Sequence, residues 1–100
     1  MGASYSLRPM AHALVLIKAE QEALSSLGGA LAEVDGVSEA FSVTGEWDFV
    51  AIVRVPRYEQ VNDVVTERIA GLAGISDTYT MMAFEAYSKH DLEAMFSIGG

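Results

Sequence analysis

Asp35-Gly36-Val37-Ser38-Glu39-Ala40-Phe41-Ser42-Val43 is the stretch that decides the fold, because the chain repeats it once. The second copy begins 38 positions later and reads Ala73-Gly74-Ile75-Ser76-Asp77-Thr78-Tyr79-Thr80-Met81. The same offset also aligns two sets of apolar residues that precede each copy. Leu14, Val15 and Ile17 align with Ile52, Val53 and Val55. Leu27, Leu31 and Val34 align with Val65, Ile69 and Leu72. Two copies of one strand–helix–strand unit therefore account for most of the 100 residues.

Hydrophobic periodicity predicts the elements within each copy. Continuous apolar runs are typical of buried strands, and apolar residues at helical spacing are typical of amphipathic helices. On the strand over residues 37–44, we expect Val37, Phe41 and Val43 on one side. The expected elements are strands over residues 11–19, 37–44, 48–55 and 75–87, and helices over residues 21–34, 57–72 and 89–97.

Glycines mark the ends and the middle of the predicted helices. Gly36 ends the first helix in a left-handed conformation, and Gly74 repeats that role after the second helix. Gly28-Gly29 falls inside the first helical pattern. We interpret this pair as a close approach of helix to sheet, with a hinge as the alternative.

The element order β-α-β-β-α-β predicts an α+β fold, the ferredoxin-like plait. It consists of a four-stranded antiparallel sheet with two helices on one face. We assign residues 11–88 to one domain, residues 1–10 to an N-terminal arm or tag, and residues 89–100 to a C-terminal tail with a short helix.

Composition excludes several classes of function. The formal net charge is −8, from 14 acidic and 6 basic residues, and such a charge repels nucleic-acid phosphates. The absence of cysteine excludes disulfides and thiolate metal sites. No apolar run approaches the roughly 18–20 residues that a membrane span requires. We therefore expect a cytoplasmic protein without direct nucleic-acid binding, and no residue pattern indicates a cofactor.

The two central strands are apolar on both faces, although two helices can cover only one face of the sheet. Leu14 and Leu16 alternate with Val15 and Ile17, for example. A second copy packed sheet against sheet would hide the other face, which predicts a dimeric α/β barrel. The terminal apolar residues Leu92, Met95 and Phe96 either strap this dimer or cover the edge of their own sheet.

Two short motifs resemble the leucine-responsive/asparagine-regulator (Lrp/AsnC) family of transcription regulators. The first is Thr44-Gly45-Glu46-Trp47-Asp48-Phe49, and the second is Gly74-Ile75 followed by Thr78 and Thr80. They are similar to the turn and the fourth strand of that family's effector-binding domain, also called the RAM domain. Tyr87-Ser88-Lys89 stands where the family ends this strand with an aromatic–lysine pair. The resemblance extends from Met10 to Lys89.

The resemblance implies a regulatory module that binds a small effector, usually an amino acid, where homodimers meet in a larger ring. It places the ligand-binding site at Thr44, Gly45, Glu46, Trp47, Asp48, Thr78 and Thr80. Full-length family members carry a helix-turn-helix DNA-binding domain, for which this chain has no counterpart. We therefore expect a stand-alone member or an excised domain, whose partners could include full-length Lrp/AsnC regulators.

The residue types in this site suit an amino-acid ligand. Glycine permits close approach of backbone N–H groups, a carboxylate such as Asp48 binds an ammonium group, and threonine hydroxyls bond to either. Each residue also has a structural interpretation. Asp48 can cap the turn in its own subunit, the threonines are good strand formers, and Trp47 is expected at an oligomer contact or as a ligand wall.

An enzyme is the alternative hypothesis, since dimeric barrels of this type include cofactor-independent oxygenases and isomerases. Such an enzyme requires placed acids, bases or metal ligands. The two histidines, His12 and His90, lie at the start of a strand and in the tail, and no metal-ligand spacing is present. The sequence therefore favours a binding module with no catalytic residues over an enzyme.

Overall fold

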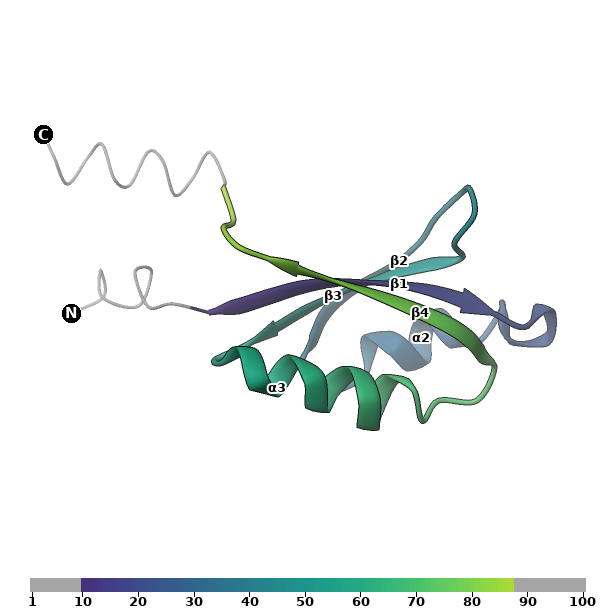
Figure 1. Ribbon diagram of the computed structural model, residues 1–100. Coiled ribbons are helices and arrows are strands. Elements are labelled where there is room, and N and C mark those ends of the chain that lie inside the picture. Colours follow the sequence, from purple (N-terminus) through teal and green to yellow (C-terminus); the bar gives the residue numbers. More distant parts are fainter. Residues whose placement is uncertain (1–9, 88–100) are drawn as a thin grey trace, which may run out of the picture.

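The four strands lie in the order β2-β3-β1-β4, and each neighbouring pair is antiparallel. They span Ala11–Ala19 (β1), Val37–Ser42 (β2), Phe49–Val55 (β3) and Ile75–Ala83 (β4). In this computed structural model, which describes residues 10–87, the helices lie together on one face of the sheet (Figure 1). The predicted ferredoxin-like plait is confirmed. Residues 1–9 of the predicted arm and the predicted terminal helix over residues 89–97 lie outside the described residues.

The core lies between the helices and one face of β1 and β3. Alternate residues of β1 are buried, because successive side chains of a strand point to opposite faces. The helices close this layer with Leu27 and Leu31 from the first repeat and Val61, Val64 and Ile69 from the second. The strand residues of the core are Ala11, Ala13, Val15 and Ile17 in β1 and Phe49, Ala51, Val53 and Val55 in β3.

The prediction of one continuous helix over residues 21–34 is wrong, because the structure has two shorter segments there. The structure has a 3₁₀ turn, η1, over Gln21–Ala23, and a short helix, α2, over Leu27–Ala32. Between them the backbone makes i→i−3 bonds, such as Ser26 N–H to the Ala23 carbonyl at 3.1 Å. Ser25 and Ser26, which are poor helix formers, lie at this break, and Gly28 and Gly29 follow inside α2.

The predicted second helix is confirmed over most of its length. Helix α3 spans Tyr58–Asp63 and continues as a π-helical segment, η2, over Val64–Ile69. At its start, the Gln60 side chain accepts a hydrogen bond from the Arg57 N–H at 3.0 Å. At its end, the Ala70 N–H reaches the Val65 carbonyl at 2.9 Å, which is the i→i−5 bond of a π-helix.

A β-bulge in β2 changes which of its side chains share a face, compared with the prediction. Val37 pairs with Val53, but the next pairs are Glu39 with Ile52 and Ala40 with Ala51. The extra residue reverses the alternation, so Val37 and Ala40 pack against the core while Phe41 lies on the opposite face. The expectation that Val37 and Phe41 share a side is therefore wrong.

The predicted fourth strand is longer than the observed one. β4 ends at Ala83 rather than Tyr87, and its pairing with β1 ends at His12–Ala83. Within residues 10–87, no helix has the length and apolar character needed to cross a membrane.

The glycines predicted at the helix ends have the expected backbone conformation. Gly36 and Gly74 have φ angles of 100° and 93°, a region that side chains disfavour. At Gly36, an added Cβ would lie 2.6 Å from Val64 Cγ2. Gly28 faces the Phe49 ring, with 3.2 Å from an added Cβ to Cε1, which supports the close approach of helix to sheet.

Gly36→Ala should destabilise the fold by about 1–3 kcal/mol, because the methyl group meets Val64 and the positive φ is strained. Gly29→Ala is the matched control. Gly29 is helical with no neighbour within 4 Å, so this change should stabilise the protein by about 0.5–1 kcal/mol. Urea unfolding at one protein concentration measures both changes. A Gly36→Ala midpoint equal to or above that of Gly29→Ala would contradict the assignment.

Candidate functional site

The turn between β2 and β3 rises from the sheet on the side away from the helices (Figure 1). It joins Ser42 to Phe49 and contains all five turn residues of the predicted site. At Gly45, φ is 106° and nothing lies within 4 Å of an added Cβ, so glycine is required here by backbone conformation and not by crowding. Thr44, Gly45 and Glu46 are exposed. The backbone of the turn is therefore accessible to a ligand or a second subunit.

Asp48 fastens this turn to the end of β1. Its Oδ2 accepts a hydrogen bond from the Ala19 N–H at 2.9 Å. Its own N–H donates to the Ile17 carbonyl at 2.9 Å, and its carbonyl accepts from the Val43 N–H at 3.0 Å. Asp48 thus has the structural role of holding the turn, while a carboxylate keeps further acceptor capacity for a ligand.

The Trp47 side chain extends from the turn toward Tyr79 of β4 and Lys18 of β1. Its ring centroid lies 6.3 Å from that of Tyr79 on β4, with 36° between the ring planes. The Lys18 ammonium lies 5.3 Å from the Trp47 centroid, within the range of a cation–π contact. The same ammonium is 3.7 Å from Glu46 Oε2. These residues place an aromatic pair beside one positive and one negative charge.

Lys18 and Tyr79 were not among the predicted site residues. Lys18 ends the apolar run of β1, and its contacts cross 28 and 29 positions to Glu46 and Trp47. The alternation of side chains along a strand is the sequence signal that could have identified them. Lys18 lies on the same face of β1 as Leu14 and Leu16, and Tyr79 pairs directly with Leu16. This register also places Tyr79 on the face opposite to Thr78 and Thr80.

Thr78 and Thr80 lie on the other face of the sheet from Trp47 and Tyr79. Thr78 pairs with Ile17 and Thr80 with Val15, and directly paired residues share a face. Both partners belong to the buried core on the helix side. β1 also separates β4 from β3, which is a spacing of about 10 Å between those strands. One subunit therefore does not bring the turn and the threonines together.

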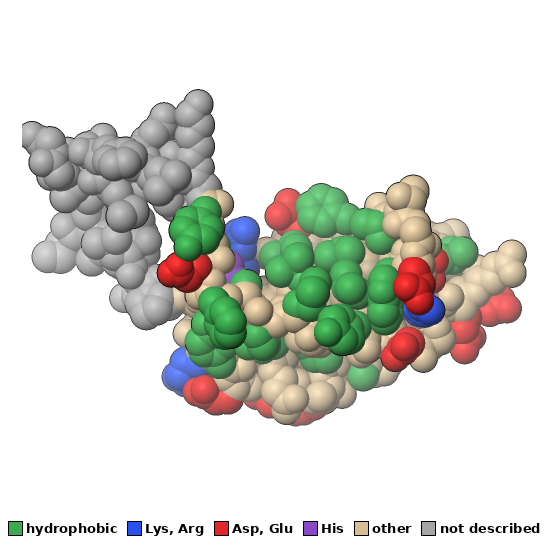
Figure 2. All heavy atoms as spheres, turned by 45° about the horizontal axis from the view of Figure 1, so that its top comes forward, with side chains coloured by type: hydrophobic (Ala, Val, Ile, Leu, Met, Phe, Trp, Pro, Cys, Tyr) green, Lys and Arg blue, Asp and Glu red, His purple; other side chains and the backbone are tan. Residues whose placement is uncertain are grey.

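The face of the sheet away from the helices is apolar and uncovered within residues 10–87. Figure 2 shows its hydrophobic side chains as one group over the middle of the sheet. Phe41, Tyr79 and Met81 remain 48%, 56% and 40% exposed. We call this group the open face. By register and burial it contains Leu14 and Leu16 of β1, Phe41 of β2, Val50 and Ile52 of β3, and Tyr79 and Met81 of β4.

The ionisable side chains of the described residues do not form a metal-binding cluster. Within residues 10–87, no three His, Asp or Glu side chains gather closely enough to hold a metal ion. His12 lies on β1 opposite Arg54 and Ala83, away from the turn. Near the C-terminal limit of the described residues, Glu85 accepts a 2.6 Å hydrogen bond from the Tyr87 hydroxyl and raises the pKa of that exposed phenol.

Residues 12–92 match the family described as the Lrp/AsnC ligand binding domain. The chain belongs to this family. The resemblance seen in the turn and in β4 is thereby confirmed. The open face and the β2–β3 turn are accordingly surfaces of an Lrp/AsnC domain.

Individual relatives agree with this assignment. An HTH-type transcriptional regulator of Pyrococcus furiosus is 37% identical over 54 residues, which are 54% of this chain and 36% of that protein. The chain thus spans about a third of the length of this curated relative. The curated relatives are described as transcriptional regulators and not as enzymes.

Solved structures show the same fold. A crystal structure of a protein from Thermus thermophilus has a TM-score of 0.73 and 43% identity, covering 79% of this chain and 99% of that chain. A transcriptional regulator from Neisseria meningitidis, solved as a complex with L-Met, has a TM-score of 0.70 and 14% identity, covering 88% and 57% of the two chains. At that identity, the second likeness concerns the Lrp/AsnC fold alone.

Asp48→Ala should lower the free energy of unfolding by about 1–3 kcal/mol, because it leaves the Ala19 N–H without its acceptor. Asp48→Asn keeps an acceptor oxygen and should cost less. Glu46→Ala removes only an exposed ion pair and should change stability by less than about 0.5 kcal/mol. Chemical denaturation compares the three variants. Equal losses for Asp48→Ala and Glu46→Ala would show that Asp48 does not anchor the turn.

Proposed function

We propose that this chain is an amino-acid-binding regulatory module of the Lrp/AsnC type, which binds its effector between dimers and has no catalytic or DNA-binding activity of its own. The observation that carries the proposal is the match of residues 12–92 to the ligand-binding domain of this family. The L-Met complex of the regulator from Neisseria meningitidis supports an amino acid as the class of ligand.

The dimer is proposed to form through the open face. Burial of about half of a large apolar side chain contributes on the order of 1 kcal/mol, and two copies of the open face contribute such side chains from both sides. The sum can offset an association cost of about 4–15 kcal/mol. Sheet-to-sheet packing would also shield Phe41 and Met81 from water.

The effector site is proposed to need more than one subunit. The turn residues Thr44, Gly45, Glu46, Trp47 and Asp48 approach from one subunit. Thr78 and Thr80 lie on the helix side of the edge strand β4, where a neighbouring dimer can reach them. A ligand held between both sets would favour the assembled ring over separate dimers, which is the linkage expected of an effector.

The chemistry of the turn suits both ends of an amino acid. The Lys18 ammonium can pair with a ligand carboxylate, while Glu46 and Asp48 can accept hydrogen bonds from a ligand ammonium. Trp47 and Tyr79 supply an aromatic wall for the ligand side chain. Lys18 and Tyr79 thus join the proposed site on structural grounds.

Phe41→Glu should convert the dimer to monomer, because it places two charges in the apolar contact between open faces. Leu24→Glu is the control. Leu24 is 44% exposed, close to the 48% of Phe41, but it lies in the turn between η1 and α2 rather than on the open face. Sedimentation velocity of the wild type and both variants measures association. A dimer that survives Phe41→Glu would contradict sheet-to-sheet packing.

A panel of the standard amino acids should identify a ligand that raises the melting temperature and shifts sedimentation toward a larger assembly. At a ligand concentration about 100 times its Kd, linkage stabilises the protein by about 2.7 kcal/mol, a shift on the order of 10 °C. Trp47 is the only tryptophan, so its fluorescence reports binding at the turn.

Glu46→Gln should weaken this ligand's binding, whereas Glu59→Gln, an equally exposed carboxylate at the N-terminal end of α3, should not. The proposal is wrong if no amino acid changes the melting temperature, the assembly or the Trp47 fluorescence.

A further inference from the structure

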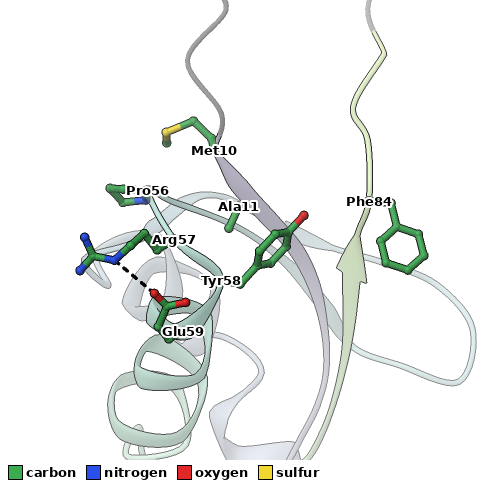
Figure 3. A pocket seen from close by; sticks show the side chains of 7 residues that line it. All are labelled: Met10, Ala11, Pro56, Arg57, Tyr58, Glu59 and Phe84. Carbon is green, nitrogen blue, oxygen red and sulfur yellow. Dashed lines mark ion pairs between the residues drawn. The ribbon is translucent and has the colours of Figure 1, made fainter.

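An apolar groove lies at the opposite end of the sheet from the β2–β3 turn. It is bounded by the start of β1, the segment that leads from β3 into α3, and the chain just after β4, and its volume is about 440 Å³. In Figure 3, Met10 and Pro56 line one side, Tyr58 points between the strands, and Phe84 stands at the far side. The Arg57–Glu59 ion pair, 3.2 Å long, lies at its rim.

The side chains of this groove are more exposed than their chemistry favours. Phe84 is 92% exposed, Tyr58 50% and Met10 42%. Apolar side chains gathered around a hollow are typical of a surface that another segment covers. The groove adjoins the start of α3, and none of the residues that line it belongs to the open face.

The place where the described chain ends points to one segment as the occupant. The described chain passes the groove at Phe84 and ends at Tyr87. Four residues of extended chain reach at most about 14 Å, so residue 88 begins within that distance of Phe84. Leu92, Met95 and Phe96 follow at i, i+3, i+4 spacing, which places them on one face if the tail is helical.

We propose that the tail over residues 88–97 docks into this groove of its own chain through Leu92, Met95 and Phe96. The tail would then cover Tyr58 and Phe84, rather than strap a second copy. The match to the Lrp/AsnC domain covers residues 12–92, so it includes Leu92 but not Met95 or Phe96.

Cysteine cross-linking tests the proposal directly, because the chain contains no cysteine of its own. The Tyr58→Cys/Met95→Cys variant should form a disulfide within one chain under mild oxidation, since a disulfide requires Cα atoms about 4.4–6.8 Å apart. A Glu67→Cys/Met95→Cys control should not, because Glu67 lies about 14 Å further along the same helix. An equimolar mixture of the two single variants, Tyr58→Cys and Met95→Cys, should give no cross-linked dimer.

A second measurement does not depend on disulfide geometry. In the full chain, Tyr58→Cys should react with a thiol reagent about tenfold more slowly than in the same chain carrying Leu92→Asp/Phe96→Asp, because the docked tail shields it. Glu93→Gln, a change outside the apolar set, should leave the rate unchanged. The proposal is overturned if Leu92→Asp/Phe96→Asp does not raise the rate, or if the mixture of single variants cross-links between chains.

Discussion

Strand β1 carries the constraint on which the rest of the structure depends. It pairs with β3 on one side and β4 on the other, and four of its alternate residues are at most 2% exposed. Because side chains alternate along a strand, burying Val15 and Ile17 under the helices necessarily turns Leu14 and Leu16 to the opposite face. Because directly paired residues share a face, the side chains of β3 and β4 are divided between the same two faces. One buried face therefore creates both the core and the uncovered apolar surface.

The end of β1 also sets the geometry of the candidate site. Asp48 binds the backbone at Ile17 and Ala19, so the β2–β3 turn is held where β1 leaves the sheet. Lys18 lies between these two residues and faces the other way, toward Trp47. A turn that was free of this anchor would not place Trp47 against both Lys18 and Tyr79. Asp48 thus anchors the turn while its carboxylate keeps further acceptor capacity, so its structural role is compatible with the proposed ligand contact.

The site was predictable in part. Motif spacing located the turn residues and the two threonines, and the left-handed glycine at position 45 is present in the structure. Whether these residues bind a ligand stays a prediction. The sequence did not reveal Lys18 and Tyr79, because their contacts with Trp47 join residues about 30 positions apart on different strands. It also did not reveal that β1 separates the threonines from the turn, since that depends on the order of strands in the sheet.

The sequence by itself determined the order of strands and helices, the plait, and the glycines that end the helices. These features follow from periodicity and backbone sterics, which act between near neighbours in the chain. Only the tertiary structure decided the bulge that puts Val37 and Phe41 on opposite faces and the partners of Trp47. Each of these depends on which residue lies across a strand or under a helix, and such contacts exist only after distant segments have packed together.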